Sequence, residues 1–167
     1  MKLDEFCTIL DKFLSGEQSY QGRLETAVRL VSRAFNVKPD EVAILLIDEK
    51  GETLGFAWPP HLKEAGIIPL SATNPLVAKT ARENRGFLNN TFAVTPHASF
   101  FEKFRDKGNQ PLPIQKIMSV PLAGSGTIKG VLQVSRKGQD PASAGADFSK
   151  NELLALEKIA SLIAAHL

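Results

Sequence analysis

Few side chains in this 167-residue sequence could carry out chemistry of their own. The chain contains one cysteine, Cys7, and three histidines, His61, His97 and His166. A single thiol excludes an intramolecular disulfide, a cysteine-rich metal site and any dithiol redox mechanism. We find no paired carboxylates, no Ser/His/Asp set and no metal-ligand spacing. We therefore predict no catalytic residues, no metal site and no enzymatic activity.

Aromatic and hydrogen-bonding side chains gather between Trp58 and Phe104, with Ser119 as a further polar group. A small-molecule site needs an apolar cavity with a few convergent polar groups, and these residues supply both kinds. The alternative is that the aromatic side chains simply fill a second core. The candidate ligand-binding residues are Trp58, Asn89, Thr91, Phe92, His97, Phe100, Phe101 and Ser119.

Among these candidates, His97 is the one that could hold a cofactor iron. It falls in the first turn of a predicted short helix, where the helix dipole disfavours the protonated imidazole. A neutral imidazole can be an axial ligand of haem. A histidine at a helix start is more often a surface or capping residue, so we do not expect a haem, and the cofactor stays unassigned.

The periodicity of apolar residues predicts helices alternating with strands. Helical spacing predicts helices over residues 3–14, 22–36, 75–84, 97–106 and 150–167. Apolar runs bounded by turn residues predict strands over residues 41–48, 52–58, 86–90 and 114–122, and a further strand after Gly126. In the third helix, Asn74 is the expected N-cap and Pro75 the first helical residue. Thr95 and Pro96 repeat this device before the fourth helix.

Short turns join the strands in pairs at both ends of the predicted sheet. The turns are 49–51 and Gly124-Ser125-Gly126. Hairpins imply antiparallel pairing, which predicts an α+β fold. We expect the terminal helices on one face of a central antiparallel sheet, and the short helices and loops over the other face.

The last helix has a strong start signal. Ser149 at the N-cap with Glu152 three residues later forms a capping box, and Phe148 can pack on Leu153 as a hydrophobic staple. Apolar residues then recur roughly every 3.5 residues, as in a helix that packs against another helix. They are Leu153, Leu156, Ala160, Ile163 and Leu167.

In this order of elements the sequence resembles a GAF domain. The resemblance rests on the hairpin over 40–54, on the helix-to-strand segment RENRGFLNN at 82–90, and on the segment from Met118 to the end. It divides the chain into an N-terminal helical extension, residues 1–20, and a GAF domain, residues 21–167. The resemblance implies a GAF/PAS-like sheet with a small-molecule pocket on one face, and terminal helices that mediate dimers.

Known GAF chemistries can be compared with this sequence residue by residue. Cyclic-nucleotide-binding members carry an Asn-Lys pair, a Phe and an Asp-Glu pair. Here the first pair is Arg136-Lys137, Phe148 matches, and the second pair is Glu152-Leu153, so half of the motif is missing. Members that reduce free methionine sulfoxide use several cysteines, and bilin-binding members use a cysteine for attachment. Cys7 is better explained as a small buried apolar residue, so we expect no covalent bilin.

Composition narrows the partners and the location. The formal net charge is +2 and is spread along the chain, which gives no indication of nucleic-acid binding. No stretch approaches the roughly 18 to 20 apolar residues that span a bilayer, and we expect no direct membrane insertion. A single cysteine fits a reducing compartment, so a cytoplasmic location is predicted.

Together these observations predict a non-catalytic sensory GAF domain. We expect it to bind a small molecule of unknown identity, to form a homodimer through its terminal helices, and to signal through those helices. The expected output domain, in the same full-length chain, is that of a chemotaxis receptor, a histidine kinase or a cyclase. The alternative is a structural dimerisation or interaction module without a ligand.

Overall fold

The computed structural model describes residues 1–95 and 112–167. Its helices are α1 Leu3–Gly16, α2 Tyr20–Ala34, α3 Leu76–Glu83 and α4 Lys150–His166. Its strands are β1 Val42–Ile47, β2 Thr53–Trp58, β3 Ile67–Pro69, β4 Phe87–Asn89, β5 Ile114–Ala123 and β6 Ile128–Lys137. Short 3-10 helices cover Pro39–Glu41, Pro60–Leu62 and Phe92–Val94. The fourth predicted helix, 97–106, lies outside the described residues.

The six strands form one antiparallel sheet in the order β3-β2-β1-β6-β5-β4. The two predicted hairpins, β1–β2 and β5–β6, are joined side by side through β1 and β6 at the centre of the sheet. The α+β prediction is confirmed. Strand β3 was not predicted, because its three residues are too short to show any periodicity.

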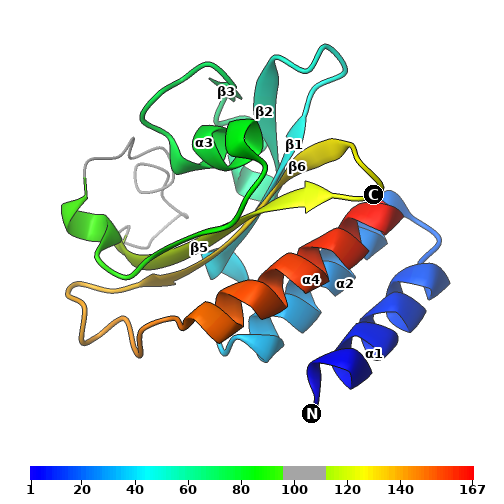
Figure 1. Cartoon of the computed structure of the whole chain (residues 1–167), viewed down its shortest axis with the longest axis horizontal. Coiled ribbons are helices and arrows are strands. Elements are labelled where there is room, and N and C mark those ends of the chain that lie inside the picture. The colour runs from blue at the N-terminus through cyan, green and yellow to red at the C-terminus, as the bar shows by residue number, and fades with distance from the viewer. Residues whose placement is uncertain (96–111) are drawn as a thin grey trace.

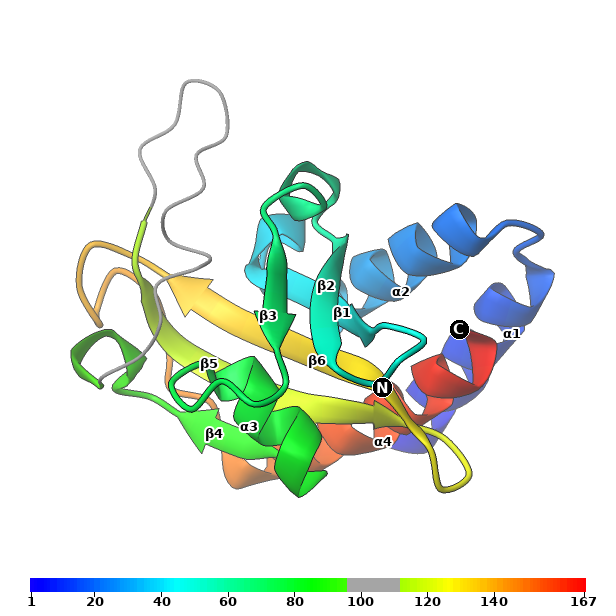
Figure 2. The ribbon, with the colours of Figure 1, turned by 90° about the horizontal axis from the view of Figure 1, so that it is seen from above.

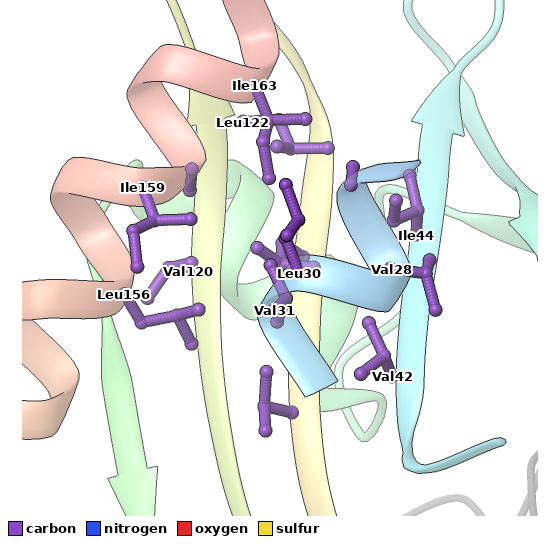
Figure 3. Packing of buried hydrophobic residues seen from close by; sticks show 14 of the residues in the cluster. Val28, Leu30, Val31, Val42, Ile44, Val120, Leu122, Leu156, Ile159 and Ile163 are labelled. Atoms are coloured by element: carbon purple, nitrogen blue, oxygen red, sulfur yellow. The ribbon is translucent and has the colours of Figure 1, made fainter. Parts of the chain in front are cut away.

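Helices cover both faces of the sheet (Figure 1). The terminal helices α2 and α4 lie against one face, with α1 on their outer side, and α3 lies on the opposite face (Figures 1 and 2). On the first face, side chains from α2 and α4 pack directly onto the central strands (Figure 3). This first core includes Val31, Ile44, Val120, Leu132 and Ile159, all at most 1% exposed. The predicted placement of the helices is confirmed.

The first helix packs beside the last. Leu10 and Leu14 of α1 are buried in the first core. Lys158 Nζ on α4 forms an ion pair with Asp4 Oδ1, and His166 Nε2 lies 2.8 Å from Asp11 Oδ1. Residue numbers rise together along the two helices in these contacts, so α1 and α4 run parallel.

The capping box of α4 is confirmed, and the regular spacing of apolar residues along this helix is explained by the core of the domain. Glu152 N donates to Ser149 Oγ at 3.1 Å, and Ser149 N donates to Glu152 Oε2 at 2.7 Å. Leu156, Ala160 and Ile163 are completely buried in the core of the domain itself. Their spacing therefore reflects packing onto the sheet, and they do not offer a face to another chain.

The start of α3 also differs from the prediction. The helix begins at Leu76, its N-cap is Pro75 rather than Asn74, and no side chain caps it. Pro75 has an extended backbone, with ψ at 125°, so it precedes the first helical turn instead of opening it. The helix ends at Glu83, and its C-cap, Asn84, has a left-handed backbone (φ 47°) that terminates it before Gly86.

Replacing Gly130 with alanine should strongly destabilise the fold. Gly130 lies in β6 opposite Leu46, and a Cβ there would lie 2.0 Å from the carbonyl oxygen of Leu45. The two central strands would have to separate, which should lower the free energy of unfolding by roughly 3 kcal/mol in urea titrations. Gly124→Ala is the control, since a Cβ at Gly124 meets open space. Equal stability of the two variants would contradict the importance of the close contact between β1 and β6 at Gly130.

The Asp4–Lys158 pair should make a small, pH-dependent contribution to stability. The hydrogen bond and charge of Lys158 hold the pKa of Asp4 below its ordinary value of 3.8. A depressed carboxyl pKa stabilises the folded state above the unfolded-state pKa, and this gain is lost as pH falls through the folded-state pKa. Asp4→Asn should therefore lower stability at neutral pH, with the difference vanishing in acid. A difference that persists unchanged in acidic urea titrations would contradict this assignment.

Candidate functional site

A hydrogen-bonded chain of buried polar side chains lies between α3 and the sheet. Gln133 Nε2 donates to Ser119 Oγ at 3.0 Å, and Ser119 Oγ lies 2.7 Å from Thr80 Oγ1. Thr80 donates its one hydroxyl hydrogen to the carbonyl oxygen of Leu76 at 2.9 Å. Ser119 must therefore donate to Thr80, which gives all the bonds one direction. We call Gln133, Ser119 and Thr80 the polar chain.

Apolar clusters lie on the same face of the sheet as the polar chain. One joins α3 to the strands β1, β2, β3 and β6, with Leu45, Leu54 and Val77 among its buried members. A smaller one consists of Phe92, Ile114 and Ile117. The three members of the polar chain are at most 3% exposed. Burial of polar groups costs free energy unless they are hydrogen-bonded, so this chain is a specific feature and not an accident of packing.

The structure brings several predicted site residues onto this face. Ser119 is a member of the polar chain, and Phe92 is buried against Ile114 and Ile117. Asn89 lies at the end of β4 opposite Ile117. Thr91 is exposed beside it.

Asn89 organises the turn that follows β4. Its Oδ1 accepts from the backbone N of Thr91 at 2.8 Å and from the Thr91 hydroxyl at 3.1 Å. Its Nδ2 donates to Thr95 Oγ1 at 3.0 Å. The side chain of Asn89 therefore shapes the segment that presents Phe92, which is a positioning role.

Trp58 is not brought together with the other candidates. Leu54, Phe56 and Trp58 alternate in β2, which predicts one common face, but the register with β1 shifts by one residue at Ala57. Trp58 thereby packs against the first core, on the side of the terminal helices, and its indole N–H donates to the carbonyl oxygen of Pro39 at 3.1 Å. The bulge moves this side chain away from the predicted site. His97, Phe100 and Phe101 lie outside the described residues.

Sequence reasoning missed Thr80 and Gln133. Thr80 follows Val77 and Ala78 on the buried face of α3, and Gln133 interrupts the apolar run of β6. A polar residue within an otherwise buried pattern was the available signal. Pairing them required the tertiary structure, since Thr80 and Ser119 are 39 residues apart in the chain.

Two contacts connect the α3 and β4 region to α4. Asn90 Nδ2 donates to the carbonyl oxygen of Phe148 at 2.9 Å, and Asn90 Oδ1 accepts from the backbone N of Phe148 at 2.9 Å. The backbone N of Gly86 donates to Glu157 Oε1 on α4 at 3.1 Å. Both ends of β4 are thus bonded to the last helix or to the residue just before its N-cap.

The positions of the cyclic-nucleotide motif have structural roles here. The guanidinium of Arg136 lies 4.3 Å from the centre of the Phe148 ring, and its Nη2 is 3.9 Å from Glu152 Oε1. The backbone N of Lys137 donates to Glu41 Oε1 at 2.8 Å. Arg136 and Glu152 hold the start of α4 against the sheet, which explains these residues without a nucleotide.

The thiol and the potential metal ligands offer no alternative centre in the described residues. Cys7 is partly buried, it packs against the first core, and burial raises its pKa. Within residues 1–95 and 112–167, no group of three or more His, Cys, Asp or Glu side chains is placed to hold a metal ion. In the same part of the chain, no helix has the length and apolar character needed to cross a bilayer.

Replacing Asn90 with alanine should loosen the start of α4. The variant loses both hydrogen bonds to Phe148, which should cost about 1–3 kcal/mol of unfolding free energy because the backbone groups of Phe148 lose their partner. Hydrogen exchange measured by mass spectrometry should speed up in the first turns of α4. Asn151→Ala, at an exposed position in the same helix, is the control. Identical exchange in both variants would show that the Asn90 contact does not hold the helix.

Comparison with known proteins gives one family and many similar folds. The family model of the GAF domain matches residues 19–167. The GAF domain of an Acinetobacter phosphoenolpyruvate-protein phosphotransferase aligns with a TM-score of 0.71 and 16% identity, over 99% of this chain and 94% of that one. A domain from a methyl-accepting chemotaxis protein aligns with a TM-score of 0.67 and 13% identity, over 94% of this chain and 93% of that one.

A free methionine-R-sulfoxide reductase from Neisseria meningitidis also has this fold. It aligns with a TM-score of 0.68 and 16% identity, over 98% of this chain and 87% of that one. At these identities the likenesses show the fold alone. No curated protein matches the sequence.

Proposed function

The chain belongs to the GAF domain family, and on that premise we propose that it is a non-catalytic sensory domain that binds a small molecule and signals through its terminal helices. The polar chain is the observation that carries this proposal. It places three hydrogen-bonding side chains between the sheet and α3, on the face of the sheet that also carries two apolar clusters. A few convergent polar groups within an apolar surround are typical of small-molecule sites.

The chemistry of the polar chain favours an uncharged ligand. Gln133, Ser119 and Thr80 are neutral, and a buried charge would require a charged partner. A compact, largely apolar molecule with a hydroxyl, amide or carbonyl group could exchange hydrogen bonds with Ser119 and Gln133. Asn89, Thr91, Phe92 and the predicted residues His97, Phe100 and Phe101 would surround it, whereas Trp58 would not take part.

The proposed signal passes to α4. Asn90 bonds to Phe148, and Gly86 bonds to Glu157. A shift of α3 or β4 on ligand binding would therefore change the contacts that hold the last helix. The proposed output domain, in the same full-length cytoplasmic chain, is that of a chemotaxis receptor, a histidine kinase or a cyclase. The similar domain from a methyl-accepting chemotaxis protein supports this class of output.

Absence of catalysis is part of the proposal. The Neisseria reductase shows that the fold is compatible with an enzyme. This chain has one thiol, partly buried on α1 beside Lys158 and Asp4, and a dithiol mechanism needs a second. The single cysteine therefore supports a domain that does not use this dithiol chemistry.

A ligand-free interaction module is the second candidate function. The observation that favours it is that the polar chain is already bonded internally, from Gln133 through Ser119 and Thr80 to Leu76. A purely structural role, in which the polar chain fixes the position of α3 on the sheet, is enough to explain these bonds. The proposed homodimer through the terminal helices is compatible with either function.

Native mass spectrometry of freshly purified protein should separate the two functions. We expect a non-covalent adduct that disappears on denaturation, and Gln133→Leu should lower its occupancy about tenfold because a buried hydrogen-bond donor is lost. Gln139→Leu, at an exposed position in the loop before α4, should retain the adduct. An adduct-free mass together with no thermal shift across a metabolite panel would favour the interaction module.

A further inference from the structure

One side of α1 is apolar and is only partly covered by the rest of the domain. Phe6, Ile9 and Phe13 follow helical spacing beside the buried Leu10 and Leu14. Ile9 is 36% exposed and Phe13 is 48% exposed, whereas Phe6 is partly buried. We call Phe6, Ile9 and Phe13 the α1 stripe. Three apolar side chains in line on one helix are unusual on a surface that contacts only water.

The far end of the stripe adjoins the second helix. Arg29 of α2 lies over the ring of Phe13, with its guanidinium carbon 5.8 Å from the ring centre. On the opposite flank of α1, Asp4 and Asp11 are engaged with Lys158 and His166 of α4. The stripe is therefore held in place by the rest of the domain and faces outward as a fixed surface.

Opposite charges border the stripe on its exposed side. Glu5 and Lys12 are both exposed, and they are seven residues apart. Residues seven apart lie on the same side of a helix, two turns from each other. One border of the stripe thus carries a negative charge toward its N-terminal end and a positive charge toward its C-terminal end.

We infer that the α1 stripe binds a second copy of this chain, with the two α1 helices running antiparallel. The charges decide the direction. An antiparallel pair places Glu5 beside the partner's Lys12 and Lys12 beside the partner's Glu5, around a two-fold axis close to Ile9. In a parallel pair about a two-fold axis, this charged border lies on opposite sides of the contact in the two copies, so neither ion pair would form. In the antiparallel pair, apolar side chains of both stripes meet at the centre and the ion pairs lie at the rim.

This inference rests on the homodimer of the proposed function and makes it specific. It assigns the contact to α1 and not to the apolar repeat of α4, because Leu156, Ala160 and Ile163 are buried in the domain core. A single pair of short helices buries less than the roughly 1,600 Å² of a standard interface. The dimer should therefore be weak and dependent on protein concentration.

A charge exchange tests both the surface and its direction. Sedimentation equilibrium from about 1 µM to about 500 µM should show a monomer–dimer equilibrium for the wild-type chain. Glu5→Lys and Lys12→Glu should each raise the dissociation constant at least about fivefold, because each places like charges together. The double variant E5K/K12E should restore it to within about threefold of the wild-type value.

Two further variants guard against indirect effects. Glu5 also accepts a hydrogen bond from the backbone N of Lys2, so Glu5→Lys could weaken the start of α1 by itself. The substitution Lys12→Glu does not restore that contact. Recovery of the dissociation constant in the double variant would therefore report on the dimer. Ile9→Glu should abolish association, whereas Leu154→Glu, at a 61% exposed position on α4, should leave it unchanged.

The outcomes distinguish this inference from the proposed function. A wild-type chain that stays monomeric throughout would overturn both the homodimer and the α1 contact. A wild-type dimer that is insensitive to all the α1 variants would overturn the α1 contact alone. A dimer that responds as expected would support the inference even if native mass spectrometry shows no adduct, since ligand binding is measured separately.

Discussion

The antiparallel pairing of β1 with β6 is the contact on which the rest of this structure depends. It joins two hairpins that are separated by residues 59–113, and it places Gly130 against the backbone of Leu45, where a side chain would not fit. The close approach brings Ile44 and Leu132 together on one face and Leu45 and Val131 together on the other. Without this pairing, the sheet would be divided into two parts, and neither α2 and α4 nor α3 would have a continuous sheet surface to pack on.

The two faces of this sheet have different characters. The face under the terminal helices is filled by aliphatic side chains with almost no exposure, as expected for a close-packed core. The face under α3 contains apolar clusters and the polar chain of Gln133, Ser119 and Thr80. One face therefore maintains the fold, and the other has the chemical variety that binding requires. Helix α4 links them, because it packs on the first face while Phe148 and Glu157 contact the β4 region.

Local patterns predicted the individual elements well, for physical reasons. The capping box at Ser149 and Glu152 involves neighbours in the sequence and forms as expected, and the turn at Gly124-Ser125-Gly126 joins β5 to β6. Single local features also misled. Asn74 looked like a helix cap, although the backbone at Pro75 is extended. Trp58 was a candidate for the binding site, although a bulge at Ala57, set by pairing with β1, places it on the other face of the sheet.

The sequence by itself determined the order of the longer helices and strands that the structure describes, the antiparallel hairpins and the shortage of reactive side chains, since these depend on residue type and on near neighbours. Only the tertiary structure decided which polar residues meet. Ser119 was recognisable as a candidate, but its partners Thr80 and Gln133 come from a helix and a strand that are brought together by packing. It likewise decided that the apolar repeat of α4 is buried while the α1 stripe is exposed. The same helical spacing fits a core and an interface, and only the surrounding elements distinguish them.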